Sequence, residues 1–196
     1  MKIPIFPLNG AIMFPKTNLP LNIFEERYIE MIDYSLSNNR FIGMVQQKSN
    51  NELYKIGCYG KITVFNETSD RRYLINLEGI SCFKIVKEIT TDYKFRFCEI
   101  EIYENYKNNK LNDGLKTKIL SSFQKYNEIK GMNINFDEIS KLDLVDLLKL
   151  IVMISPFDVS LKQMFLELKS NKDLYENILA TLEIELSSVE KTNTIN

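Results

Sequence analysis

The sequence contains no histidine. Histidine is the commonest general base near neutral pH, a frequent zinc ligand, and the residue that activates many catalytic serines and cysteines. Its absence excludes catalytic sites built on Ser–His or Cys–His pairs, and it removes the usual nitrogen ligand from any zinc site. Any catalytic chemistry must therefore rest on other residue types.

Glycine is also scarce, with seven residues in a chain of 196. Nothing matches the phosphate-binding pattern G-x-x-x-x-G-K-[ST], because Gly60-Lys61 is followed by Ile62 where the pattern needs a hydroxyl for magnesium. Serine–lysine pairs at helical spacing, such as Ser122 and Lys125, lack a glycine motif for an oxyanion hole. No short loop gathers the oxygen ligands that a hard cation requires. We therefore predict no catalytic residues, no metal, no cofactor and no enzymatic activity.

The three cysteines, Cys58, Cys82 and Cys98, all lie in strand-like segments, and no Cys-x-x-Cys occurs. An odd number at wide spacing predicts buried thiols in a reducing compartment rather than a disulfide framework. Redox sensing by Cys58 or Cys98 is the alternative. Their apolar neighbours favour inert thiols in the core.

Long apolar runs and strong charge are missing as well. The longest apolar run, Leu150 to Ile154, is far too short to span a bilayer, and the early prolines do not fit a signal-peptide core. The formal net charge of −1, without a long block of one sign, argues against nucleic acid as the partner. We expect a cytoplasmic protein with no membrane partner.

Residues up to about 104 show mainly strand patterns. Phe41–Gln47 and Gly57–Phe65 are predicted strands, and Tyr73, Ile75 and Leu77 alternate with polar neighbours. The polar stretch 67–71 predicts a hairpin turn.

The segment 24–38 has a helical period instead. Asn22 stands three residues before Glu25, the spacing of a capping box, and Asn38-Asn39 can end the helix in a left-handed conformation.

The late strand, residues 93–102, changes phase. Its apolar residues fall on odd positions through Phe97 and on even positions from Cys98. A one-residue slip in a period of two indicates a β-bulge in this strand. The alternative is a strand buried on both faces.

Beyond a polar seam at 104–114 the period becomes helical. Helices are predicted around 115–126, 144–154, 161–168 and 174–189, with Gly131 and Ser155-Pro156 as stops. We predict an α+β protein with a strand-rich subdomain at 1–106, a helical subdomain at 107–190 and a disordered tail at 191–196.

Residues 3–28 read IPIFPLNGAIMFPKTNLPLNIFEERY, in which prolines separate short apolar runs. Proline lacks a backbone donor, so the segment predicts short strands joined by bends. This order resembles the opening of the Lon protease N-terminal domain, whose pattern is close to P-L-F-P-L, then L-F-P, then L-P-L-H-I-F-E-x-R-Y. Further matches follow in the family's order: FIGMV at 41–45, LYKIGC at 53–58, RYLINLEG at 72–79, and Leu161-Lys162-Gln163 with Glu167.

The resemblance implies a small PUA-like β-barrel with one helix, followed by a helical subdomain. It also implies a stand-alone polypeptide-binding protein without the ATPase and protease modules of Lon. Its partners would be unfolded or partly folded proteins or peptides, and a Lon-type protease as a second kind of partner. The candidate peptide-binding residues are Leu19, Leu21, Glu25, Arg27 and Tyr28. We expect Arg27 to pair with a nearby carboxylate while Tyr28 packs beneath it. Asn22 stands where the family usually has histidine.

Two other functions stay open at this point. PUA-like barrels elsewhere bind structured RNA, but the basic residues here are scattered (Lys61, Arg71-Arg72, Lys107 and Lys110) rather than aligned in a stripe. An enzyme of unknown type would require a cleft that gathers polar groups from distant parts of the chain.

Overall fold

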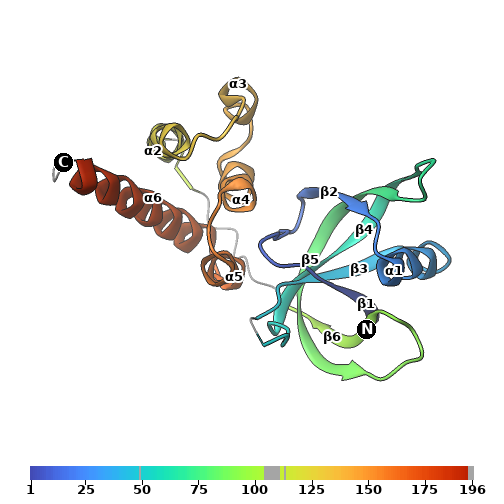
Figure 1. Ribbon diagram of the computed structural model, residues 1–196. Coiled ribbons are helices and arrows are strands. Elements are labelled where there is room, and N and C mark those ends of the chain that lie inside the picture. Colours follow the sequence, from blue (N-terminus) through green and yellow to red (C-terminus); the bar gives the residue numbers. More distant parts are fainter. Residues whose placement is uncertain (49, 104–110, 113, 194–196) are drawn as a thin grey trace. The chain divides into compact units, whose positions relative to one another are not determined.

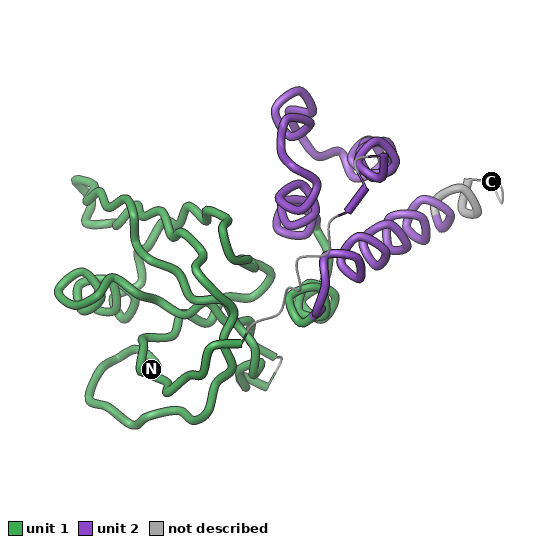
Figure 2. The backbone as a smooth tube through the Cα atoms, turned by 180° about the vertical axis from the view of Figure 1, so that it is seen from behind, with its two compact units in different colours: residues 1–104, 156–167 green, residues 105–155, 168–196 purple. Residues whose placement is uncertain are grey.

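The computed structural model describes residues 1–48, 50–103, 111–112 and 114–193. The chain divides into two compact units (Figure 2). Unit 1 contains Met1–Glu104 and Pro156–Glu167, and unit 2 contains Asn105–Ser155 and Leu168–Asn196. Lys107 and Lys110 lie outside the described residues, as does most of the polar seam.

Unit 1 is built on a six-stranded sheet with the order β2-β5-β4-β3-β1-β6 (Figure 1). Because β6 also pairs with β5, the sheet curls into a near-closed ring, and β2 lies at the end of the order. β1 and β3 are parallel, and the other pairs are antiparallel. The α+β class, with a barrel-like sheet followed by helices, is confirmed. The strands are β1 (Lys2–Pro7), β2 (Asn18–Ile23), β3 (Phe41–Val45), β4 (Ile56–Glu67), β5 (Tyr73–Ile89) and β6 (Arg96–Ile102).

The predicted hairpin joins β4 and β5, which pair from Glu67↔Tyr73 onward. Ile75 and Leu77 are buried and Leu74 is exposed, as the alternation predicts. In β2, Pro20 pairs with Asn76 of β5. Proline suits this end strand because it cannot donate a ladder hydrogen bond to a further strand.

Where β5 pairs with β6, the bulge is on β5, not on the late strand as predicted. Ile85 and Lys87 pair with the consecutive residues Ile100 and Glu99, so Val86 is the extra residue. The phase change in 93–102 fits the alternative, a strand with apolar side chains packed on both faces. Phe95 and Phe97 pack in the cluster that contains residues of helix α1 (Glu26–Leu36), and Cys98 and Ile100 lie in a second cluster. Tyr34 of α1 meets the rings of Tyr93, Phe95 and Phe97 at centroid distances of 5.0, 5.7 and 5.6 Å.

The predicted caps of this first helix are wrong. Asn22 is the fifth residue of β2 and pairs with Leu74, and the N-cap of α1 is Glu25, which makes no side-chain capping bond. At the other end the left-handed residue is Arg40, with φ of 63°, not the asparagine pair. The Arg40 amide donates to the Ser35 carbonyl at 2.8 Å, which closes the helix end.

Unit 2 contains the helices α2 (Gly114–Lys130), α3 (Phe136–Ile139), α4 (Leu144–Ile154) and α6 (Asn171–Asn193). The predicted stops are confirmed, since Gly131 has φ of 63° and α4 ends before Ser155-Pro156. The Asp143 carboxylate caps α4 by accepting the Asp146 amide at 2.8 Å. The short helix α3 was not predicted. The backbone of α6 stays helical to Asn193, within the segment expected to be a disordered tail, and residues 194–196 lie outside the description.

The remaining helix, α5 (Val159–Glu167), belongs to unit 1, although the sequence grouped it with the helical subdomain. Hydrogen bonds from its polar side chains attach α5 to unit 1, and the periodicity of the sequence does not predict such bonds. Gln163 Nε2 donates to the carbonyl of Ile56 at 3.0 Å, and Lys162 Nζ donates to the carbonyl of Gly10 at 2.7 Å. Among the described residues, no helix has both the length and the apolar character needed to cross a membrane.

The three cysteines are free and buried, as predicted. Burial raises the pKa of the Cys98 thiol to about 11, with a smaller contribution from the Glu88 charge. A protonated and inaccessible thiol is a poor nucleophile.

We therefore expect iodoacetamide at mildly alkaline pH to leave Cys58, Cys82 and Cys98 unmodified in the native protein, and to modify all three once urea unfolds it. Peptide mass spectrometry measures the labelling at each site. Rapid native labelling of Cys58 or Cys98 would contradict the inert-core interpretation and favour a redox role.

Candidate functional site

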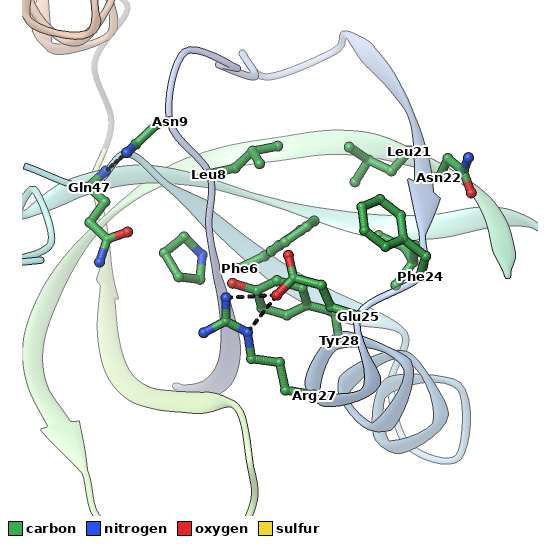
Figure 3. A pocket seen from close by; sticks show the side chains of 12 residues that line it. Phe6, Leu8, Asn9, Leu21, Asn22, Phe24, Glu25, Arg27, Tyr28 and Gln47 are labelled. Atoms are coloured by element: carbon green, nitrogen blue, oxygen red, sulfur yellow. Dashed lines mark hydrogen bonds and ion pairs between the residues drawn. The ribbon is translucent and has the colours of Figure 1, made fainter.

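A pocket of about 310 Å³ lies in unit 1 between two stretches of chain (Figure 3). One wall is the end of β1 and the residues after it, 6–9. The other runs from the end of β2 into the first turn of α1, residues 21–25, 27 and 28. Gln47, which follows β3, completes the lining. Parallel pairing of β1 with β3 brings residues 6–9 beside Gln47.

The base of the pocket is aromatic. The rings of Phe6 and Tyr28 have centroids 4.4 Å apart at an interplanar angle of 55°. Both side chains are buried, and burial raises the pKa of the Tyr28 hydroxyl while the Arg27 charge opposes that rise. Leu8 and Leu21 are partly buried and point toward one another across the pocket (Figure 3). Apolar side chains therefore line the pocket from two separate walls.

Phe24 stands at the rim and is 67% exposed. It lies between the last residue of β2 and the N-cap of α1, where the chain turns. A large aromatic side chain left in water at the edge of an apolar pocket is typical of a binding surface. Phe24 therefore extends the apolar surface outward from the pocket.

The polar edge of the pocket consists of a charge pair and three side-chain amides, those of Asn9, Asn22 and Gln47. Glu25 accepts from Arg27 Nε at 3.0 Å and from its terminal nitrogen at 2.8 Å, and the guanidinium lies 4.5 Å above the Tyr28 ring. Such an exposed pair contributes little to stability. On the opposite wall the Asn9 side-chain oxygen accepts the Gln47 backbone amide at 3.1 Å. The edge thus carries no large excess of one charge.

The structure brings four of the predicted residues together in the pocket: Leu21, Glu25, Arg27 and Tyr28. The predicted structural roles of Arg27 and Tyr28 are confirmed by the Glu25 pair and by the burial of Tyr28. The described lining does not include Leu19, which pairs with Leu77 and packs partly buried against the core.

Sequence reasoning missed Phe24 and the wall formed by Phe6, Leu8, Asn9 and Gln47. The Pro7-Leu8 pair was one visible signal, because it belongs to the first proline-containing motif. Nothing local in the sequence places it opposite Leu21.

Other kinds of site have less support. In the part of the chain that the structure describes, no three cysteine, aspartate or glutamate side chains gather as a metal site would require. Arg72 at the β4–β5 turn pairs with Asp70 at 2.9 Å, and Lys94 pairs with Glu26 at 2.9 Å. Such pairs reduce the local positive charge on which a phosphate backbone depends.

A family model described as the ATP-dependent protease La (LON) substrate-binding domain matches residues 2–183. The chain belongs to this family. The Lon protease of Desulfosudis oleivorans is 26% identical over 211 residues, which cover 99% of this chain and 24% of that protein. The Lon protease of Buchnera aphidicola subsp. Baizongia pistaciae is 24% identical over 221 residues, covering 97% of this chain and 26% of that protein. The chain thus spans about a quarter of the length of these Lon proteases.

Two solved structures share the fold of this Lon-family chain. The Lon N-terminal domain protein from Xanthomonas campestris matches with a TM-score of 0.68 and 16% identity, covering 92% of this chain and 98% of that one. The N-terminal domain of the Mycobacterium avium complex Lon protease matches with a TM-score of 0.69 and 12% identity, covering 93% of this chain and 98% of that one. At these identities the likeness shows fold alone.

Proposed function

We propose that this Lon-family chain binds exposed apolar segments of polypeptides in the pocket between β1 and β2, without carrying out chemistry on them. The supporting observation is the pocket itself, in which an aromatic base, two facing leucines and the exposed Phe24 form one apolar surface. The family description, a substrate-binding domain, agrees with this role.

The dimensions of the pocket favour a chain segment over a folded partner. A volume of about 310 Å³ accommodates a few side chains, near the lower end of the roughly 300–1,000 Å³ found for ligand pockets. Unfolded clients share apolar side chains rather than a common motif. Burial of apolar area therefore supplies affinity with modest specificity.

The polar edge fits the same role. Asn9, Asn22 and Gln47 lie at the pocket with neutral amide side chains, which can donate to and accept from the backbone of an extended segment. Arg27 is already paired with Glu25, so attraction of a charged ligand is a minor contribution. We therefore expect binding to depend weakly on salt.

In a cell the same surface would recognise unfolded or partly folded proteins. The chain would then either present these clients to a Lon-type protease or compete with that protease for them. Either role requires only binding, since the sequence has no phosphate-binding loop and no recognisable nucleophile arrangement.

The test replaces the rim aromatic. Phe24→Ser should weaken binding of a fluorescein-labelled peptide, with one phenylalanine among serines and glycines, by about tenfold or more, because a large apolar contact is lost. Fluorescence anisotropy titrations at low and high salt measure the affinity. The same peptide with serine in place of phenylalanine should bind wild type poorly.

Ile184→Ser is the matched control, since Ile184 is also 67% exposed but lies on α6 in unit 2. It should leave the affinity unchanged. Equal affinity of wild type and a folded Phe24→Ser protein would remove this pocket as the binding site. Binding that collapses with salt and is displaced by RNA would instead support a nucleic-acid partner.

A further inference from the structure

Helix α5 buries two polar side chains against the rest of unit 1. Lys162 is 5% exposed and Gln163 is 2% exposed. A buried ammonium or amide is costly unless hydrogen bonds compensate for the lost water. The cost to the ammonium is reflected in the pKa of Lys162, which burial lowers from its usual value. The hydrogen-bond partners of the Lys162 ammonium and the Gln163 amide therefore indicate which segments α5 holds in place.

Lys162 holds the segment that forms one wall of the pocket. Its ammonium donates to the Gly10 carbonyl at 2.7 Å. Gly10 has φ of 78°, and the chain bends there directly after Leu8 and Asn9, which line the pocket. The Leu8 amide also donates to the Val45 carbonyl at 3.0 Å. Between them, these two hydrogen bonds hold both ends of the 8–10 segment.

Gln163 holds the neighbouring part of that wall. Gln46 Nε2 donates to Gln163 Oε1 at 3.2 Å and to the Val159 carbonyl at 3.0 Å, and Gln163 Nε2 donates to the Ile56 carbonyl at 3.0 Å. The next residue, Gln47, lines the pocket, and its amide is bonded to the Asn9 side chain. Both segments of this wall are therefore attached to α5.

We propose that Lys162 is a positioning residue for the pocket, whose ammonium keeps residues 8–10 in the conformation that leaves the pocket open between Leu8 and Leu21. The effect of Lys162 on client binding rests on the proposed function, whereas its role in holding residues 8–10 does not. Lys162 touches no client in this scheme. It acts through the Gly10 carbonyl, and neither Gly10 nor Lys162 is among the described residues that line the pocket.

Lys162→Met tests the role, because methionine keeps most of the aliphatic stem and removes the donor. Without the ammonium, the amides of Leu8 and Gln47 should exchange with deuterium about tenfold faster, since a charged hydrogen bond no longer closes this segment. Residue-resolved NMR exchange measures both. The Ile62 amide, bonded to the Arg40 carbonyl at 2.9 Å, reports any global change in unit 1.

Lys149→Met is the matched control, since Lys149 is likewise 5% exposed but lies on α4 in unit 2. It should leave Leu8 and Gln47 exchange unchanged. If Lys162→Met does not fold, Lys162→Leu, which also lacks a donor, takes its place. The proposal is overturned if the folded variant exchanges at Leu8 and Gln47 no faster than wild type, or if Ile62 accelerates equally.

The phenylalanine-containing peptide separates this proposal from the proposed function. If wild type binds it, Lys162→Met should bind several-fold more weakly while Lys149→Met does not change. If wild type does not bind it, the proposed function fails, and the exchange data still decide whether Lys162 holds the wall.

Discussion

Leu77→Ala is expected to lower the free energy of unfolding by about 2–5 kcal/mol, the range for leucine deletions in well-packed cores. Leu77 is fully buried and lies in the cluster that joins α1 to the sheet. It pairs with Leu19 on one side and Ile62 on the other, so truncation leaves a cavity among three strands. Urea unfolding followed by far-UV circular dichroism measures the change.

Asn76→Ala is the control on the opposite face of β5. The Asn76 side chain donates to Asn18 at 2.8 Å and to Thr63 at 2.9 Å, both in exposed surroundings. Losing such bonds costs about 1 kcal/mol. Equal losses for Leu77→Ala and Asn76→Ala would contradict the inward and outward assignment of this strand.

Gly79→Ala is expected to destabilise by about 3 kcal/mol or more, although it adds one methyl group. A Cβ at Gly79 would overlap the carbonyl oxygen of Phe14, a backbone atom that no rotamer change can move away. The Gly79 carbonyl and amide also bond the Lys16 amide and the Thr17 carbonyl, both at 2.8 Å. The methyl would therefore displace the turn that leads into β2.

The measurement is again urea unfolding, with Gly114→Ala as the control. A Cβ at Gly114 meets only the Asn112 side chain at 3.5 Å, an ordinary contact. That variant should change stability by less than about 0.5 kcal/mol. A Gly79→Ala protein as stable as Gly114→Ala would show that residues 14–17 can shift away from β5 at little cost.

The sequence predicted local structure correctly where that structure depends on residues close together in the chain. The alternation through Ile75 and Leu77 produced a half-buried strand, and Gly131 ended a helix because glycine adopts positive φ without strain. The polar turn before Tyr73 produced the hairpin because the two strands that it joins are neighbours in the sequence.

Local signals failed where distant pairing overrode them. Asn22 has the spacing of a helix cap, but ladder pairing with Leu74 keeps it in β2. The slip near Phe97 suggested a bulge in that strand, yet the extra residue is Val86 on its partner. The apolar residues change phase because the two faces of the strand pack against different clusters, Phe97 on one side and Cys98 and Ile100 on the other.

The sequence by itself determined the class, the family resemblance and one wall of the pocket, because Leu21, Glu25, Arg27 and Tyr28 lie within a single short motif. Only the tertiary structure decided the other wall. Parallel pairing of β1 with β3 sets Leu8 and Asn9 beside Gln47, and α5 reaches Gly10 from 152 residues away in the chain. Periodicity records which face of an element is buried, but not which distant element covers it, and that choice depends on the packing of the whole unit.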